Sequence, residues 1–289
     1  MMLVDVVLGG LVLGGMYALV AIGFNLQYGI ARVLNLAYGE FLVTGAFAAY
    51  WMYTLWQINP IVGMALSVPV TFAANWLVYR ILIDPLARRA TNRDQFEGDT
   101  ILSTFGLLFV MNGSVILAFT GDMRSYDYLS GPINVLGLTF AANRLLAFAI
   151  SCVFAAAMYS MLMWTRTGTA MRALAIDPLA ASITAVDVPK MSSLAFATGG
   201  ALVAVAGTLV STFLAFDPTV GVDFTVKALI VVIMGGVGNM LGCLAAGVFL
   251  GVTESFTARF FDSGLKLAVA YVMFLAVLLM RPRGLFGSN

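Results

Sequence analysis

Long apolar segments follow one another along the chain, with short polar stretches between them. A helix needs about 20 mostly apolar residues to cross the ~30 Å hydrocarbon core of a bilayer. Segments near this length are residues 6–26, 41–58, 60–79, 101–119, 145–164, 191–216, 228–252 and 264–280. The pattern predicts an all-α integral membrane protein, a polytopic bundle of about eight transmembrane helices, with residues 1–289 forming a single domain.

Composition supports this prediction. Hydrophobic residues make up 61% of the chain and charged residues 10%, and the mean hydropathy is +0.98. The sequence has no histidine, and its two cysteines, Cys152 and Cys243, lie inside apolar segments. We therefore expect no disulfide framework, no metal site and no cofactor on this chain. With a net charge of +1 and no basic cluster, nucleic acid is not an expected partner.

Basic residues are unevenly distributed between the apolar segments. They concentrate in loops 80–99 and 165–190 and in the C-terminal tail, which contains Arg281 and Arg283, whereas loop 121–143 has few. Cytoplasmic loops of membrane proteins are rich in Lys and Arg. We therefore expect a multi-pass protein of the cell's inner (plasma) membrane, with both basic loops and the C-terminus in the cytoplasm.

The N-terminal region is expected on the opposite side. Asp5 and loop 121–143 should face outward, and the first apolar segment lacks the basic start and the cleavage site of a signal peptide. An even number of simple crossings would instead put both termini on the same side. At least one helix must therefore be broken or re-entrant, and the best candidate lies near Gly235.

A glycine-rich stretch interrupts the apolar segment 228–252. Residues 234–242 read MGGVGNMLG, and each glycine would cost a continuous helix roughly 1 kcal/mol relative to alanine. An unwound backbone is expected here, which a membrane protein tolerates only where it is buried in protein or lines an aqueous path. Glycine pairs spaced four residues apart, as expected where two helices pack closely, are Gly10 with Gly14 and Gly247 with Gly251.

A second interrupted stretch, residues 32–40, lies in the first half of the chain just before an apolar segment. Paired glycine-interrupted segments in the two halves of a membrane protein indicate the central pathway of a transporter. A simple interfacial turn is the alternative for residues 32–40. The residues expected near such a pathway are Asn35, Tyr38, Gly39, Glu40, Gly235, Gly236, Gly238 and Asn239.

The polar stretch 166–190 differs from the membrane-like rest of the chain. Its alanine-rich sequence around Arg172 and Asp177 predicts short helices with a small-residue face. Asp177 followed by Pro178 is typical of a helix start, with an acidic capping residue and a proline at the first helical position. Such a surface is suited to docking against another protein, and an ordinary cytosolic connector is the alternative.

Four blocks of sequence together resemble one family of membrane proteins. They are GLVLGGMYALVAIGFNLQYGI (10–30) with NLAYGE (35–40), GTAMRALAIDPLAASITAVDV (168–188), KALIVVIMGGVGNMLGCLAAGVFLG (227–251) and RPRGLFG (281–287). In order and spacing they resemble the LivH-type permeases, membrane subunits of the branched-chain amino acid importers that use ATP-binding-cassette (ABC) ATPases. The sequence departs from the family pattern at Tyr38, where histidine is usual, and at Ile176 and Ala185.

The resemblance implies a transport subunit and not an enzyme. No Gly-Lys dipeptide, and hence no P-loop, occurs in the sequence, so ATP hydrolysis is expected on separate subunits. The implied partners are two ABC ATPases, a second homologous permease, a periplasmic or extracellular solute-binding protein and the lipid bilayer. Within the loop 166–190, the residues expected to couple to an ATPase are Arg172, Asp177, Pro178, Ala180, Ala181, Ile183 and Thr184.

The resemblance leaves the cargo open among related solutes. A branched-chain or other aliphatic amino acid is expected, with urea, short amides and aromatic acids as alternatives. An alternative from another functional class is an ion-coupled secondary transporter or channel, which would need ionisable groups in mid-membrane. A third possible function is that of an intramembrane enzyme. Glu40 and Glu254 are expected near segment ends, so we expect an interior almost free of charge that favours a solute without net charge.

Overall fold

The computed structural model describes residues 2–135, 138–281 and 284–286. Its elements are α1 (Met2–Gly29), α2 (Tyr38–Trp56), α3 (Pro60–Val78), the π-helical turn η1 (Tyr79–Ile83), α4 (Asp84–Arg89), α5 (Arg93–Phe119), β1 (Pro132–Val135), β2 (Leu138–Ala141), α6 (Ala142–Trp164), α7 (Arg166–Ile176), α8 (Pro178–Ile183), α9 (Val188–Ser211), α10 (Val220–Gly235), α11 (Met240–Phe260), the 3-10 turn η2 (Ser263–Leu265) and α12 (Lys266–Met280). Arg283, one of the two tail arginines expected in the cytoplasm, lies outside the described residues.

The described residues contain six helices that are long and apolar enough to cross a membrane. These are α1 from Val6 onward, α3 with its continuation to Arg89, α5, α6, α9 and α11. They agree with the predicted all-α membrane protein. The apolar segment 228–252, which was expected to be interrupted near Gly235, contains parts of two helices, because α10 ends at Gly235 and α11 begins at Met240.

Glycine backbone geometry separates α10 from α11. Gly236 and Gly238 have φ angles of 96° and 86°, a region that residues with a Cβ rarely occupy. Asn239 then caps α11, since its Oδ1 accepts a hydrogen bond from Gly242 N at 2.9 Å. The unwound stretch expected from the glycine content is therefore present, as a turn between two helices.

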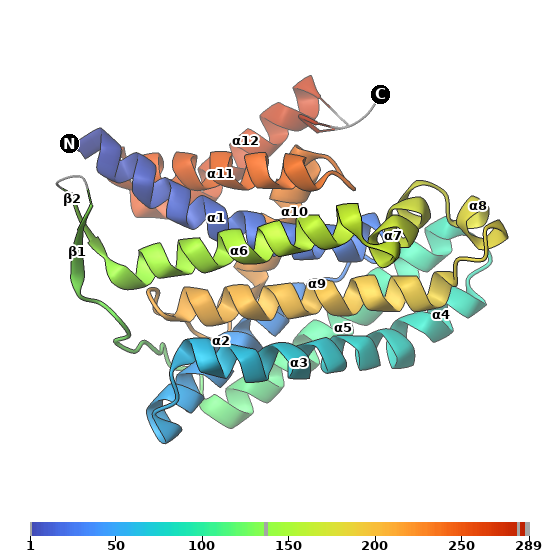
Figure 1. Ribbon diagram of the computed structural model, residues 1–289, viewed down its shortest axis with the longest axis horizontal. Helices are drawn as coiled ribbons and strands as arrows, with labels where there is room; N and C mark the ends of the chain where they lie inside the picture. The colour runs from blue at the N-terminus through green and yellow to red at the C-terminus, as the bar shows by residue number, and fades with distance from the viewer. Residues whose placement is uncertain (1, 136–137, 282–283, 287–289) are drawn as a thin grey trace.

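Most of the long helices run along the longest axis of the molecule (Figure 1). The N-terminus and the β1–β2 hairpin lie at one end, called here the hairpin end, and α7 and α8 lie at the other, the α8 end. The core lies along α9, the most completely buried of the long helices. Beside it, α1 packs against α11, where Gly10 and Gly14 meet the backbone of Val252 and Val248. The close packing predicted for these glycines is confirmed.

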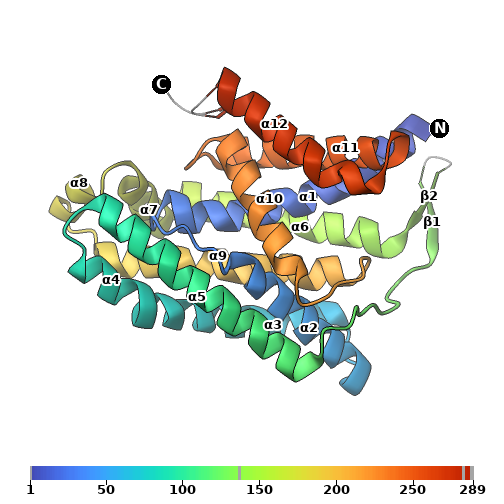
Figure 2. The same ribbon diagram turned by 180° about the vertical axis from the view of Figure 1, so that it is seen from behind.

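Two helices begin inside the molecule and not at either end. Non-helical residues 30–37 precede α2, and non-helical residues 212–219 precede α10. Tyr38, the first residue of α2, donates a hydrogen bond to Val20 O in the middle part of α1, at 2.7 Å. Figure 2 shows α10 crossing the molecule between α12 and α2. The sequence pattern predicts the first of these interruptions but not the second.

Candidate functional site

The first turns of α2 and α10 meet in the interior of the molecule. Gly39 N donates a hydrogen bond to Thr225 Oγ1 at 2.8 Å. A Cβ added to Gly221 would lie 2.9 Å from Gly39 O, so the two backbones approach as closely as glycine allows. Two helix starts that are far apart in the sequence therefore form one contact, which we call the half-helix joint (residues 38–40 and 219–225).

Buried amide side chains hold the segment that leads into the half-helix joint. Asn35 Nδ2 donates to Gln27 Oε1 at 2.9 Å, and Asn35 Oδ1 accepts from Ala37 N at 3.0 Å. Gln27 Nε2 in turn donates to Phe196 O on α9 at 2.9 Å. Because these buried polar groups are used internally, their first role is to fix the path of the chain before Tyr38.

Glu40 lies at the half-helix joint and is only 1% exposed. Its two carboxylate oxygens have no hydrogen-bond partner among the described residues. It belongs to the first turn of α2, and a Cβ on Gly221, in the first turn of α10, would lie 2.9 Å from Glu40 Oε1. The positive ends of two helix dipoles therefore favour its negative charge. Glu40 lies near a segment end, as expected, but this end is in the interior of the molecule because α2 begins there.

A buried ion pair links α1, α10 and α11. Lys227 Nζ lies 3.1 Å from Glu254 Oε1 and 2.9 Å from the hydroxyl of Tyr17. The Tyr17 hydroxyl donates a hydrogen bond to Glu254 Oε2 at 2.6 Å. The side chain of Glu254 is 1% exposed and that of Lys227 is 16% exposed. The expectation of an interior almost free of charge, with Glu254 near a segment end, is therefore wrong.

The sequence pattern contains a signal for this pair. Lys227 stands at the head of the apolar run KALIVV, directly before the segment predicted to start at residue 228. A charged side chain is expensive in a membrane, so a lysine in such a run indicates a buried partner or a functional site. Glu254, 27 residues further on, is that partner.

The unwound stretch 235–239 does not contribute to the half-helix joint. Gly238 N donates to Asn25 Oδ1 near the C-terminal end of α1, at 2.8 Å. Asn239 Nδ2 donates to Phe286 O at 2.8 Å, so the end of the described chain covers this turn. The sequence blocks 227–251 and 281–287 therefore contact each other at this turn.

The structure does not bring the two predicted interrupted stretches together. Asn35 binds Gln27, whereas Gly238 binds Asn25. Positions two apart on an α-helix point about 200° apart, so the two stretches contact opposite sides of α1. Asn35, with residues 38–40, leads to the half-helix joint, and residues 235–239 form the turn between α10 and α11.

Asp177 starts α8, as predicted. Asp177 Oδ1 accepts hydrogen bonds from Leu179 N at 2.9 Å and from Ala180 N at 3.1 Å, and Pro178 occupies the first helical turn. The short polar side chain thus satisfies two backbone donors that a helix start leaves free. At the other end of α8, Thr184 N donates to Ala180 O at 3.3 Å.

The α8 region presents an apolar surface formed by Ile176, Leu179 and Ile183, which we call the α8 face. These side chains are 83%, 72% and 80% exposed. Ala181 is only 3% exposed and packs inward, so the expectation that it meets an ATPase is wrong. Arg172, on α7, is half-buried. Leu179 was not among the expected coupling residues, because the orientation of a six-residue helix cannot be derived from its periodicity. Ile176, the last residue of α7, was not among them either.

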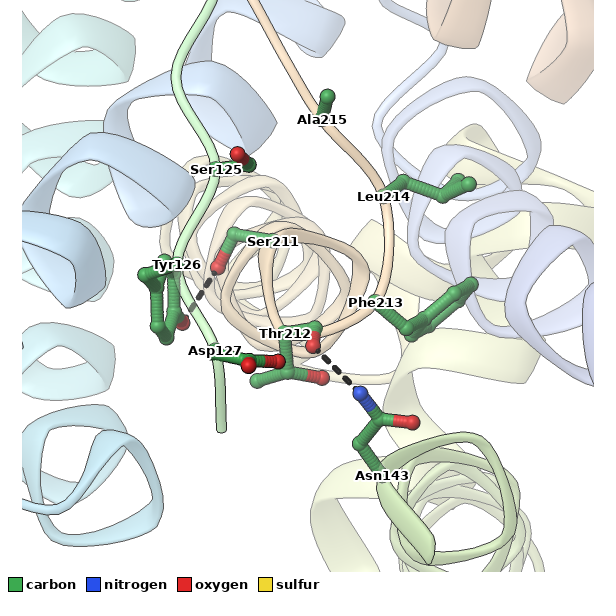
Figure 3. A pocket seen from close by; sticks show the side chains of 9 residues that line it. All are labelled: Ser125, Tyr126, Asp127, Asn143, Ser211, Thr212, Phe213, Leu214 and Ala215. Carbon is green, nitrogen blue, oxygen red and sulfur yellow. Dashed lines mark hydrogen bonds between the residues drawn. The ribbon is translucent and has the colours of Figure 1, made fainter. Parts of the chain in front are cut away.

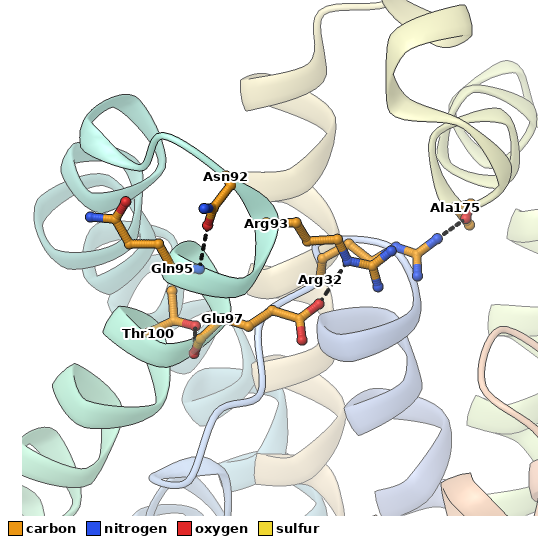
Figure 4. A network of polar contacts seen from close by, with 7 residues as sticks. All are labelled: Arg32, Asn92, Arg93, Gln95, Glu97, Thr100 and Ala175. Atoms are coloured by element: carbon orange, nitrogen blue, oxygen red, sulfur yellow. Dashed lines mark hydrogen bonds and ion pairs between the residues drawn. The ribbon is translucent and has the colours of Figure 1, made fainter.

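Arg32 joins α7 to the segment that leads to the half-helix joint. Arg32 Nη2 donates to Ala175 O at 2.5 Å, and its φ angle is 59°, which is uncommon for a residue with a side chain. Figure 4 shows the Arg32 side chain next to that of Arg93, which instead donates to Glu97 on its own helix at 2.8 Å. Arg32 was not predicted as a site residue, although it begins the interrupted stretch 32–40.

Comparison with known proteins identifies relatives over almost the whole chain. The family described as "Branched-chain amino acid transport system / permease component" matches residues 6–278. The high-affinity branched-chain amino acid transport system permease protein BraD of Pseudomonas aeruginosa is 28% identical over 293 residues, which cover 96% of this chain and 94% of that protein. The corresponding permease protein LivH of Salmonella typhimurium is 24% identical, with 96% and 93% covered.

A relative is also found in an archaeon. The probable branched-chain amino acid transport permease protein LivH of Methanocaldococcus jannaschii is 24% identical, with 97% of this chain and 91% of that protein covered. No solved structure matches the chain. Since the family match spans residues 6–278 and the described helices are those of a membrane protein, the chain belongs to the family of branched-chain amino acid transport permease components.

Proposed function

We propose that the chain is the permease subunit of an ABC importer for branched-chain or other aliphatic amino acids. The observation that carries this proposal is the α8 face, where Ile176, Leu179 and Ile183 are exposed at one end of the molecule. Apolar side chains grouped on an exposed surface mark an interaction site. The partner on this face is an ABC ATPase, and the cargo is the one named for the relatives.

The remaining assembly follows from the same proposal. ATP is hydrolysed on two ATPase subunits, so this chain carries no cofactor of its own. A second, homologous permease and an extracellular solute-binding protein complete the importer in the inner membrane.

The α8 end faces the cytoplasm, and the hairpin end faces outward. At the α8 end, η1 with α4, the start of α5, α7 and the start of α9 contain Arg80, Arg88, Arg89, Arg93, Arg166, Arg172 and Lys190, and Arg32 binds α7. At the hairpin end, the loop before β1, the start of α6, the end of α11 and the start of α12 contain Arg124, Arg144, Arg259 and Lys266. The excess at the α8 end supports this orientation, because Lys and Arg accumulate in cytoplasmic loops.

The chain crosses the membrane nine times and not eight. The six long helices cross once each, α12 crosses once, and α2 and α10 each complete a crossing together with residues 30–37 and 212–219. An odd number of crossings places the two termini on opposite sides, and the charge pattern then puts the N-terminus outside and the C-terminus in the cytoplasm. This count removes the conflict between eight simple crossings and the charge pattern.

Arg32 transmits movement of the ATPase to the interior of the permease. Movement of α8 displaces α7, and the hydrogen bond from Arg32 to Ala175 O passes the displacement to residues 30–37. This segment ends at Tyr38, at the half-helix joint. Since Gly39 and Gly221 pack backbone against backbone, α2 and α10 then move together.

Arg32→Gly is expected to lower ATP-driven uptake about ten-fold, the loss expected for one hydrogen bond from a charged group. Glycine keeps the left-handed backbone at this position, so the change removes the guanidinium without adding backbone strain. Uptake and ATP hydrolysis are measured in the reconstituted importer. ATP hydrolysis should continue while uptake falls, because the link between them is weakened.

The neighbouring Arg93 provides the matched control for Arg32. Its guanidinium binds Glu97 within α5, so Arg93→Gly should leave the ratio of uptake to ATP hydrolysis unchanged. An equal ratio of uptake to ATP hydrolysis in wild type and Arg32→Gly would show that Arg32 does not transmit the movement of α8 to the half-helix joint.

Glu40 favours a second candidate function. A buried carboxylate without a hydrogen-bond partner among the described residues is what an ion-coupled transporter would need. Purification of the tagged chain in mild detergent from its native cells separates the two functions. We expect two ABC ATPases and a second permease to co-purify, and a chain that purifies without any ATPase would contradict the proposed function.

A further inference from the structure

A pocket of about 420 Å³ lies at the hairpin end, over the last turn of α9. Figure 3 shows Tyr126 and Asp127 on one side of it and Phe213 and Leu214 on the other, with Asn143 from α6 at the bottom of the view. Because α9 is the most buried long helix, the pocket lies above the centre of the fold. Its position is on the side proposed to face outward.

Hydrogen-bond acceptors predominate on the polar side of the pocket. Asn143 is 7% exposed; its Nδ2 donates to Thr212 O at 2.9 Å, while its Oδ1 has no partner among the described residues. The carboxylate of Asp127 is exposed nearby. The pocket also lies at the C-terminal end of α9, where the helix dipole is negative and favours cations.

The residues that line this pocket carry no positive charge. The hydroxyl of Tyr126 lies 2.9 Å from Ser211 Oγ, and burial raises the pKa of Tyr126 to about 12, so this hydroxyl stays neutral. Arg124 directs its guanidinium toward Thr120. Arg144 and Lys266 line an adjoining pocket on the other side of Phe213 and Leu214, which belong to both linings, and neither cation lines the pocket of Asn143 and Asp127.

We propose that this pocket binds the primary ammonium group of a small aliphatic solute before the solute enters the membrane interior. An ammonium group has three donors and no acceptor, which complements Asn143 Oδ1 and the Asp127 carboxylate. Phe213 and Leu214 offer an apolar wall for an aliphatic side chain. The volume is that of a site for a small molecule. Naming an amino acid as this solute rests on the proposed function.

The test is equilibrium binding of radiolabelled leucine to the full-length permease, purified with its partner permease and ATPases and placed in lipid nanodiscs. The solute-binding protein is left out because it would bind leucine itself. Leucine amide, which keeps the ammonium group and lacks the carboxylate, should compete. 4-Methylpentanoate, which lacks the ammonium group, should compete about ten-fold less well or worse, as expected for the loss of one charged hydrogen bond. Equal competition by both compounds would overturn the inference.

Variants of the lining residues make the test specific to this pocket. Asp127→Asn and Asn143→Leu should each weaken leucine binding about ten-fold, and Ser130→Ala, in an exposed residue outside the pocket, should not. Asp127 is exposed, so its variant remains informative if Asn143→Leu fails to fold. Unchanged leucine binding in Asp127→Asn would overturn the inference.

Two further outcomes separate this inference from the proposed function. If the importer takes up leucine with ATP but leucine amide does not compete in the binding assay, the ammonium-binding role of the pocket would be overturned. The proposed function would still stand. If Asp127→Asn instead abolished association with the solute-binding protein and left leucine binding intact, the ammonium group would come from a lysine of that protein. That result would also overturn the assignment to a small solute.

Discussion

Replacing Leu179 and Ile183 together by glutamate is expected to abolish the ATP hydrolysis that the solute-binding protein stimulates. The two side chains are 72% and 80% exposed in the free chain, so the permease itself should still fold and insert. In the importer they would be buried against an ATPase, where burial of each side chain contributes about 1.5–3 kcal/mol to the free energy of association. Two buried glutamates without partners add a desolvation penalty, so we expect stimulated activity to fall about 100-fold or more.

Matched variants separate the loss of the apolar surface from a general effect of substitution. Leu179→Met with Ile183→Met keeps the α8 face apolar and should retain stimulated ATP hydrolysis. Ala181→Arg is a poor test of docking, because Ala181 is buried and the substitution would disturb the packing of α8 itself. Full stimulation in a folded and inserted glutamate double variant would contradict the role of the α8 face.

Lys227→Met is expected to destabilise the protein by about 3–5 kcal/mol, because it leaves Glu254 buried without its charged partner. Glu254 is 1% exposed, and its remaining hydrogen bond comes from the hydroxyl of Tyr17. Thermal unfolding in detergent and the yield of monodisperse protein both report this loss.

The double variant Lys227→Met with Glu254→Gln should recover most of the lost stability. Removing both charges of a buried pair is often neutral, whereas removing one is not. The amide of glutamine also keeps an acceptor for Tyr17. A single variant as stable as the double variant would show that Lys227 and Glu254 are not an interdependent buried pair.

Local chemistry predicted the helix ends correctly in two places. Asp177 with Pro178 predicted the start of α8, because a capping carboxylate and a proline act within their own turn. The glycines of residues 234–242 predicted the break before α11, because glycine destabilises a continuous helix. The structure shows the break at Gly236 and Gly238, which have positive φ angles. In both cases the determining interactions lie within a few residues of each other.

Depth within the molecule was not predictable in the same way. Glu40 stands near the beginning of an apolar segment, but that segment begins in the interior because Gly39 packs against Gly221, far away in the sequence. Lys227 was missed because the apolar segment was taken to start one residue later. Both residues depend on contacts between distant helices, which hydropathy along the chain does not report.

The contact between the C-terminal residues and the turn 235–239 was also not predictable, because it joins segments that are distant in the sequence. The blocks 227–251 and 281–287 were recognised separately, and nothing in their spacing shows that Asn239 binds Phe286 O. The residues expected along one pathway therefore divide between the half-helix joint and a structural turn at the other side of α1.

Release of labelled leucine from proteoliposomes tests the central claim most directly. The vesicles contain the complete importer, with the ATPase side outward, and enclose the solute-binding protein and leucine, so that transport is measured as ATP-driven release from the lumen. We predict release that requires ATP outside, continues after ionophores collapse every ion gradient, and is lost in the Leu179→Glu, Ile183→Glu double variant. Leucine transport driven by an ion gradient without ATP, and unaffected by that double variant, would contradict the account.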